Sequence, residues 1–187
     1  MIHDRAKQAP KLSRDEEKGW ILEDGVHIIS FRLNTFQIFL DSLVSVVGLK
    51  IAVALMHRMG NAIGHATMQY ARDEVRRDDD LGKVLDKVLL TRGWGRCVEA
   101  SKKHEGGRAL YVFKLSGTPV SQEHKATEPT CQLIRGLLAG LVEAYHGRGG
   151  AESVEKECVA VGGKHCIFEV TLPVNAALVA VGTTKHA

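Results

Sequence analysis

The stretch "VEKECVAVGGKHC", residues 154–166, places two cysteines eight residues apart, with a glycine pair between them. A glycine turn between two strand-like runs is typical of a β-hairpin. In such a hairpin Cys158 and Cys166 would lie on adjacent strands and could face each other across the turn. Glu155 could bring its carboxylate to the same point if the strand begins irregularly, whereas Glu157 points to the opposite face of a regular strand.

On the residues alone, three interpretations of these thiols stay open. Zinc needs about four N, S or O ligands, and Cys131, ahead of the hairpin, could supply a third thiolate beside the carboxylate. Free cysteine is also a common buried core residue. A redox role is the third interpretation, since a disulfide between residues 158 and 166 is geometrically possible. Cys97 stands in a strand-like run without a partner nearby, and we interpret it as a packing residue.

The composition is that of an ordinary globular domain, with 187 residues, 44% of them apolar and 25% charged. A net charge of +3 is too mild to indicate nucleic-acid binding. The polar N-terminus lacks the apolar core of a signal peptide. Polar residues interrupt the apolar run 36–56, so we expect a buried helix pair and no membrane span. Reduced thiols and a cytoplasmic location are therefore expected.

Periodicity and turn signals predict, in order, a strand or hairpin, three helices, a hairpin, a helix and a last hairpin. This order predicts an α+β domain in which an antiparallel sheet is covered by helices. Residues 1–19 are expected to form a flexible N-terminal arm, 20–172 the domain and 173–187 a C-terminal extension. The expected ranges are 20–32, 36–48, 49–77, 78–93, 95–115, 131–150 and 151–173.

Two of the expected helices carry glycines four residues apart on one face, Gly60 with Gly64 and Gly136 with Gly140. Each interior glycine costs roughly 1 kcal/mol relative to alanine in a helix. The pair in the longer helix makes sense where a ligand or another backbone approaches closely. Both helix packing and a ligand site are kept as interpretations.

The segments "CQLIRGLLAGLVEAYHGR" and "VEKECVAVGGKHCIFEV" together resemble the vinyl-4-reductase domain family. A cysteine opens a glycine-faced helix, and Glu-x-x-Cys, a glycine turn and a second cysteine follow. The upstream "RMGNAIG" and "RGWGR" also fit, so the resemblance spans roughly residues 25–172. The residues that carry it are Cys131, Gly136, Gly140, Glu155, Cys158, Gly162, Cys166 and Phe168.

This family includes sensory domains of phenol- and xylene-responsive activators and a protein of bacteriochlorophyll synthesis, and its fold resembles that of transport-particle (TRAPP-like) subunits. The resemblance implies a dimer with a lipophilic cavity. It also implies zinc as the cofactor, held by Cys131, Glu155, Cys158 and Cys166. Three thiolates and a carboxylate leave no open coordination position, which describes a structural site.

The resemblance further implies a pocket between the glycine-bearing long helix and the hairpins. An apolar pocket with few polar groups suits a small aromatic, a lipid tail or a tetrapyrrole. Core packing or helix packing is the plainer interpretation of each lining residue. The expected lining comprises Met59, Gly60, His65, Trp94, Tyr111 and Phe113.

The first expectation for function is a zinc-stabilised ligand-binding module, a homodimer that signals through a partner protein. A 4-vinyl reductase or tetrapyrrole carrier accessory is one alternative, and a TRAPP-like scaffold subunit is another. A reductase needs a hydride source, but "GWGRCVEA" lacks the third glycine of a dinucleotide motif and precedes a strand. We therefore expect a binding protein more than an enzyme, and we assign no catalytic residue.

Overall fold

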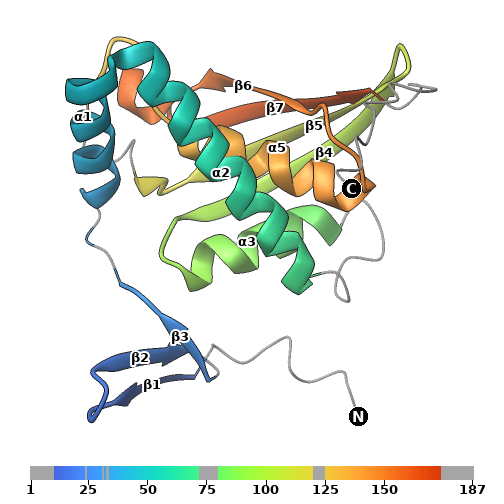
Figure 1. Ribbon diagram of the computed structural model, residues 1–187. Helices are drawn as coiled ribbons and strands as arrows, with labels where there is room; N and C mark the ends of the chain where they lie inside the picture. The colour runs from blue at the N-terminus through green and yellow to red at the C-terminus, as the bar shows by residue number, and fades with distance from the viewer. Residues whose placement is uncertain are drawn as a thin grey trace, which may run out of the picture.

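The computed structural model describes residues 11–23, 25–30, 32, 34–71, 80–119 and 125–173. The described residues form two antiparallel sheets and four α-helices, an α+β architecture that confirms the expected fold class (Figure 1). The elements are β1 (Leu12–Asp15), β2 (Trp20–Glu23), β3 (Val26–Ile28), α1 (Thr35–Val47), α2 (Leu49–Ala71), α3 (Asp80–Thr91), β4 (Arg96–Glu105), β5 (Arg108–Ser116), α5 (Gln132–His146), β6 (Glu152–Glu157), the short 3₁₀ helix η2 (Val159–Val161) and β7 (Cys166–Pro173).

The larger sheet has the strand order β4-β5-β7-β6, with every pair antiparallel. Buried and half-buried residues alternate along β5 and along β7. In the register between these strands, Phe113 pairs with Phe168 and Leu115 pairs with Cys166. Alternation of this kind places one face of an antiparallel sheet on the core and leaves the other toward solvent.

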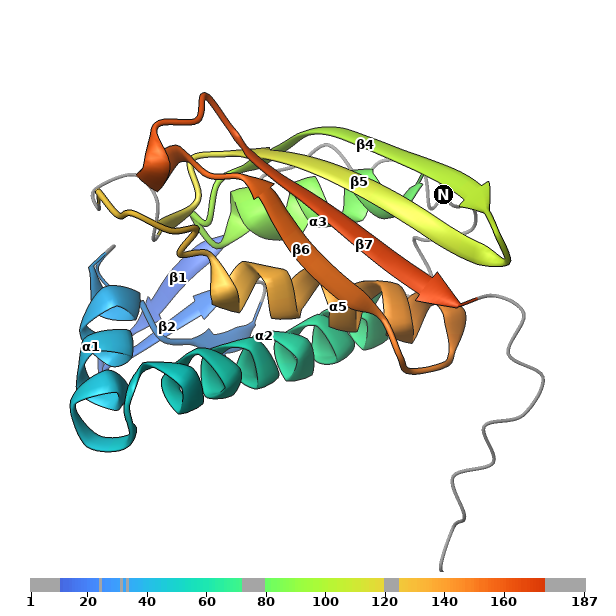
Figure 2. The ribbon, with the colours of Figure 1, turned by 90° about the horizontal axis from the view of Figure 1, so that it is seen from above.

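Helices lie in layers on the inner face of this sheet (Figure 2). The central helix α5 packs directly against the sheet, and ten of its fifteen residues are buried. The longer helix α2 crosses the other side of α5, while α3 packs beside β4. Apolar or small residues cover most of the circumference of α5, as expected for a helix that lies between another helix and a sheet.

The paired glycines let α2 and α5 approach at backbone distance. A Cβ added to Gly60 would overlap the carbonyl of Leu133, and one added to Gly136 would overlap the carbonyl of His57. Gly64 and Gly140 are equally close to the opposite backbone. Helix packing is therefore the correct interpretation of these four glycines, because they permit the backbones of α2 and α5 to approach each other closely.

The N-terminal segment corrects one expectation. Residues 12–15 form β1, which pairs with β2 from Leu12 opposite Glu23 to Asp15 opposite Trp20, so they are not part of a loose arm. A turn closed by Gly19 at φ 67° and by the Lys18 amide donating to Asp15 Oδ1 joins the two strands. The polar composition concealed this strand, because its pairing depends on residues further along the chain.

The rest of the expected arm (1–10), the end of the long helix (72–77) and nearly all of the C-terminal extension (174–187) lie outside the described residues. Within the described part of the chain, no helix combines the length and the apolar character needed to cross a bilayer.

Candidate metal centre and ligand groove

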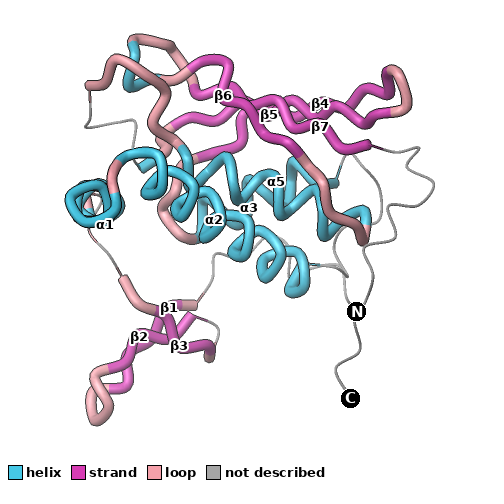
Figure 3. The backbone as a smooth tube through the Cα atoms, turned by 45° about the horizontal axis from the view of Figure 1, so that its top comes forward, coloured by secondary structure: helices cyan, strands magenta, loops and turns pink. Residues whose placement is uncertain are grey.

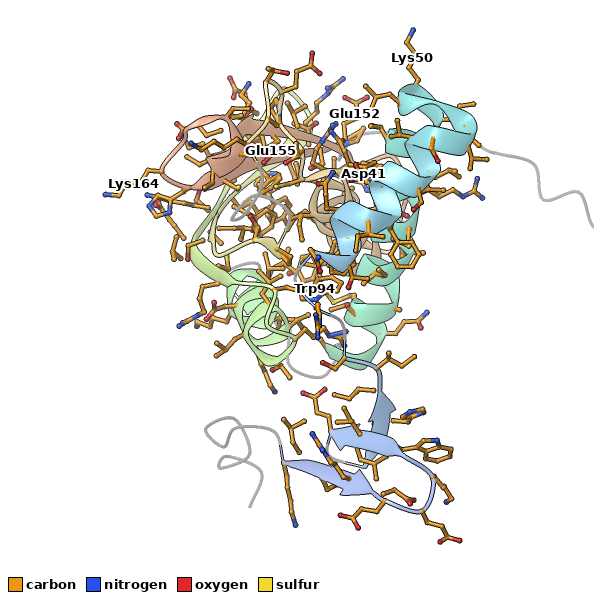
Figure 4. All side chains as sticks on the ribbon, turned by 90° about the vertical axis from the view of Figure 1, so that its left-hand side faces the viewer. Asp41, Lys50, Trp94, Glu152, Glu155 and Lys164 are labelled. Carbon is orange, nitrogen blue, oxygen red and sulfur yellow. The ribbon has the colours of Figure 1, made fainter. Side chains whose placement is uncertain are left out.

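Four side chains from three elements converge beneath the last hairpin. Cys131 directly precedes α5, Glu155 lies in β6, Cys158 follows β6, and Cys166 begins β7. Their ligand atoms, three sulfurs and one carboxylate oxygen, all lie within 4.8 Å of one another. In Figure 4, Glu155 lies within the body of the molecule, whereas Lys164 of the connecting turn points outward.

A bulge in β6 explains how two side chains three residues apart reach the same side. Glu155 pairs with Phe168, but Glu157 pairs with Ile167, so one extra residue is inserted between them. A β-bulge resets the inward and outward alternation of a strand. Glu155 and Cys158 are consequently both buried, while Glu157 is exposed as expected.

The spacing of the sulfurs fits a tetrahedral ion. The Sγ of Cys131 lies 4.0 Å from that of Cys158 and 3.8 Å from that of Cys166. Thiolates at about 2.3 Å from a tetrahedral zinc lie roughly 3.8 Å apart. A disulfide would bring two sulfurs to about 2.05 Å, and no disulfide joins any of the four cysteines.

Because these four side chains are buried, their ionised forms are costly in free energy unless a cation is bound. All three cysteines are fully buried, and Glu155 is only 8% exposed. Burial first, and the hydrogen bond with Cys158 next, raise the pKa of Glu155 to about 7. Hydrogen bonds with Cys158 and Cys166, together with burial, raise the pKa of Cys131 far above that of a free thiol. A metal ion reverses this cost, because it binds the deprotonated forms.

One carboxylate oxygen of Glu155 is positioned for such an ion. Oε2 accepts a hydrogen bond from the Cys131 amide at 3.1 Å. Oε1 is buried and has no hydrogen-bond partner among the described residues. Buried polar atoms are nearly always satisfied, so an unsatisfied oxygen beside three thiols is a candidate ligand position for a metal ion.

Two further groups support the sulfurs from outside the cluster. The Thr118 hydroxyl lies 3.3 Å from Cys166 Sγ, and the Val159 amide donates to the same sulfur at 3.5 Å. Outer donors of this kind orient metal ligands and stabilise thiolates. No spacing signal in the sequence linked Thr118 to the cysteines, because only the fold brings the end of β5 to the hairpin.

A groove of about 380 Å³ opens between α3 and the β4–β5 hairpin. Tyr111 and Phe113 line it, and their rings lie parallel with centroids 6.0 Å apart. The Tyr111 hydroxyl lies 2.8 Å from His146 Nε2, and Lys102 Nζ lies 5.3 Å from the centre of the Tyr111 ring. The remaining lining residues are Leu81, Gly82, Ala100, Ser101 and His104.

The other four expected pocket residues do not line this groove. Met59 is 41% exposed on α2, and Gly60 packs on α5. Trp94 is half-buried and meets Phe36 edge to face, with centroids 5.2 Å apart. His65 bonds across to α5 and lies outside the groove. Of the expected set, therefore, Tyr111 and Phe113 line this groove, and both side chains are almost fully buried.

Glu143 of α5 is a connecting residue that the sequence did not indicate. Its Oε2 accepts from Asn61 at 2.8 Å and lies 3.0 Å from His65 Nε2, and its Oε1 accepts from the amides of Gly150 and Ala151. Burial tends to raise the pKa of Glu143, but these hydrogen bonds outweigh it and lower the pKa. This carboxylate joins α2, α5 and the loop that leads to β6.

Comparison with known proteins places this architecture among solved structures. The crystal structure of the phenol-responsive sensory domain of the transcription activator PoxR with phenol matches with a TM-score of 0.71, at 20% identity, over 86% of this chain and 84% of that chain. A vinyl-4-reductase family protein from Methanocaldococcus jannaschii matches with a TM-score of 0.52, at 24% identity, over 76% and 82%. The chain has the fold of these domains.

A trafficking protein particle complex subunit 3 from Naegleria fowleri, covalently bound to palmitic acid, gives a TM-score of 0.49 at 17% identity, over 74% of this chain and 93% of that chain. That score is too low to argue from. No family model matches the sequence, and no curated protein matches it either. The expected relations to phenol-sensing domains and to vinyl-4-reductase proteins are confirmed at the level of the fold.

Proposed function

We propose that this chain is a zinc-stabilised, small-molecule-binding domain of the sensor type. The observation that carries the proposal is the buried cluster of Cys131, Glu155, Cys158 and Cys166, with sulfur spacing that suits a tetrahedral ion. Three thiolates favour zinc over the hard cations magnesium and calcium. The four ligands would fill the coordination shell, so the ion supplies structure and no catalysis.

Such an ion would join the start of α5 to the β6–β7 hairpin. The hairpin side of the cluster contributes three ligands and α5 contributes Cys131, which lies 35 residues before Cys166. Closure of a segment of this length restricts the unfolded chain, and binding free energy at a structural zinc site adds directly to folding.

Elemental analysis and native mass spectrometry of the purified protein test the zinc site. We expect about one zinc ion per chain. Replacement of one ligand, Cys158→Ser, should lower zinc occupancy and lower the Tm by about 5 °C or more. Cys97→Ser is the matched control, because Cys97 lies outside the cluster, and it should retain zinc. The zinc site would be wrong if the purified protein contained no metal and Cys158→Ser were as stable as Cys97→Ser.

The groove lined by Tyr111 and Phe113 is our candidate for the ligand site. The proposed ligand is a hydrophobic small molecule, with a small aromatic as the first choice over a lipid tail or a tetrapyrrole. An aromatic floor favours a flat ring, because stacked and edge-to-face contacts add to the burial of apolar surface. The neighbouring PoxR domain was crystallised with phenol, which supports the same choice.

Calorimetric titration with phenol and its methylated derivatives tests this site. Ala100→Phe should block the groove and weaken binding at least tenfold, because Ala100 forms part of its wall. Glu99→Phe is the control, since Glu99 pairs with Lys114 on the opposite face of the sheet. If phenol binds equally well to both variants, the groove is not the ligand site.

A Soret absorption band in the purified protein would instead favour the alternative of a tetrapyrrole carrier or 4-vinyl reductase accessory.

We further propose that the domain acts as a cytoplasmic homodimer and signals through a partner protein. The four free cysteines suit a reducing compartment. Helix α1 supports self-association, because none of its thirteen residues is buried although most are apolar. A helix with such a composition normally covers an apolar surface.

A further inference from the structure

The groove between α3 and the β4–β5 hairpin combines aromatic and basic side chains on one face of the sheet. Ala100, Lys102 and His104 of β4 lie two residues apart, so they share one face of the strand. In the register with β5, Ala100 is paired with Phe113. Lys102 is paired with Tyr111 in the same way. Tyr111 and Phe113, the aromatic floor of the groove, occupy buried positions of β5, so a lysine and a histidine lie on the same inner face as the floor.

Charged residues are sorted between the two faces of β4. Glu99, Lys103 and Glu105 occupy the alternate positions, which point to the outer face of the sheet. There the carboxylate of Glu99 lies 3.8 Å from an ammonium group of β5. Among the described residues that line the groove, Lys102 and His104 have basic side chains and none is acidic. The described walls therefore combine an apolar floor with basic groups.

The two basic side chains lie on the part of β4 that extends beyond its contact with α3. Gly82 of α3 packs so closely on β4 that a Cβ added to it would overlap the Cβ of Ala100. Figure 2 and Figure 3 show the β4–β5 hairpin continuing past α3 toward its turn. Lys102 is half-buried and His104 is exposed. A ligand group held by these two side chains would therefore lie where the groove meets solvent.

The groove has the size for a single ring that bears a polar group. Apolar cavities of about 150 Å³ take benzene, and this groove measures about 380 Å³. On the floor, the Tyr111 hydroxyl already lies at hydrogen-bond distance, 2.8 Å, from His146 Nε2. Lys102 and His104 are therefore the hydrogen-bond donors that a polar group at the mouth of the groove would meet.

We propose that the groove selects aromatic carboxylates, with the ring on the aromatic floor and the carboxylate at Lys102 and His104. This inference rests on the proposed small-molecule function and names the class of its ligand. Lys102 Nζ lies 5.3 Å from the centre of the Tyr111 ring, so a positive charge stands beside the surface on which the ligand ring would lie. A hydrogen bond between an ammonium group and a carboxylate is roughly twice as strong as one between neutral groups.

An inward-pointing charge on an edge strand can also serve the fold. β4 is an edge strand of the larger sheet, and such charges discourage pairing with the edge of another chain. That role requires no groove of ring size and no aromatic floor beside the charge. The two roles therefore predict different results for ligands of the same shape and different charge.

Calorimetric titration with 4-hydroxybenzoate and 4-hydroxybenzamide tests the proposal, because the two compounds differ in charge but scarcely in shape. The full-length protein should bind the acid about tenfold more tightly than the amide. Lys102→Met keeps an unbranched side chain without the charge, and it should abolish this preference. Lys103→Met is the matched control, because this neighbouring lysine is exposed on the outer face, and it should retain the preference.

The salt dependence of the wild-type protein gives a second test that does not depend on the stability of a variant. Raising the ionic strength from about 0.05 M to about 0.5 M should weaken binding of the acid and leave binding of the amide nearly unchanged. If the wild type binds acid and amide equally, or Lys102→Met retains the preference, the ligand class is wrong and the small-molecule function still stands. If neither compound nor phenol binds, both are wrong, and the zinc content is judged separately.

Discussion

Single residues in this molecule gain their roles from partners distant in sequence. Glu155 alone would be a strand carboxylate, yet the bulge that follows it brings Cys158 to the same side of β6, and burial raises the pKa of Glu155 to about 7. Glu143 has the opposite environment, because four hydrogen bonds satisfy its oxygens and lower its pKa. The pKa values of the two carboxylates are therefore shifted in opposite directions, upward for Glu155 and downward for Glu143.

Replacing Glu143 by glutamine should destabilise the fold by about 1–3 kcal/mol at pH 7, because an amide NH₂ would face groups that are themselves donors. Its folded pKa lies below its unfolded value, so the stabilisation is present above the unfolded pKa and is lost as pH falls through the folded pKa. Urea denaturation from pH 7 to pH 3 should show a smaller acid loss in Glu143→Gln than in the wild type.

The control for this change is Glu169→Gln, which removes a partly exposed ion pair with Lys156 at 3.3 Å. Such surface pairs contribute at most about 1 kcal/mol. Equal effects of the two substitutions would show that Glu143 is not a connecting residue of the fold.

At the scale of elements, glycine spacing determines how the two principal helices meet. Gly60 and Gly64 of α2 face Gly136 and Gly140 of α5, and each lies against the opposite backbone. A backbone contact of this kind allows the Asn61 and His65 side chains to reach Glu143 across the crossing. The hydrogen bonds to Glu143 thus depend on the close packing of α2 on α5. A change that separates the two helices should weaken these hydrogen bonds.

Gly136→Ala should lower the free energy of unfolding by about 1–3 kcal/mol or more, because the added methyl overlaps the His57 carbonyl and forces the helices apart. This loss exceeds the gain of roughly 1 kcal/mol in helix propensity from replacing glycine by alanine. Chemical denaturation measures the difference.

The matched control is Lys87→Ala, an exposed position on α3 where a change should remain within about 0.5 kcal/mol. If Gly136→Ala stabilised the protein, propensity would outweigh packing, and the close approach of the helices would be incorrect.

Elements with local signals could be predicted from the sequence. The hairpin at Gly106–Gly107 and the last hairpin are marked by glycines between strand-like runs, and both are confirmed. The strand β1 could not be recognised, because its pairing with β2 depends on a register that its own polar residues do not reveal. The bulge after Glu155 was equally hidden, since a bulge depends on how the partner strand is placed.

At the scale of the whole molecule, the α+β class and the clustering of four candidate metal ligands were predicted, and the ligand pocket stays a prediction. The spacing of Cys158 and Cys166 left metal, core and redox interpretations open, and the family resemblance favoured metal. The six expected pocket residues were chosen from separate motifs, and only the tertiary arrangement shows that Tyr111 and Phe113 lie at the groove while Gly60 packs on a helix. Surfaces between elements depend on contacts that no single motif contains.

The position of α5 between α2 and the sheet has a consequence for biosynthesis. Translation proceeds from the N-terminus, and domains tend to fold as they leave the ribosome. Here α2 emerges long before α5, so its glycine face has no partner until residue 146 has been made. The four proposed metal ligands, from Cys131 to Cys166, also lie in the last third of the chain. The nascent chain must therefore wait for its last third, and a truncated product that ends before Cys131 would lack both the central helix and every proposed zinc ligand.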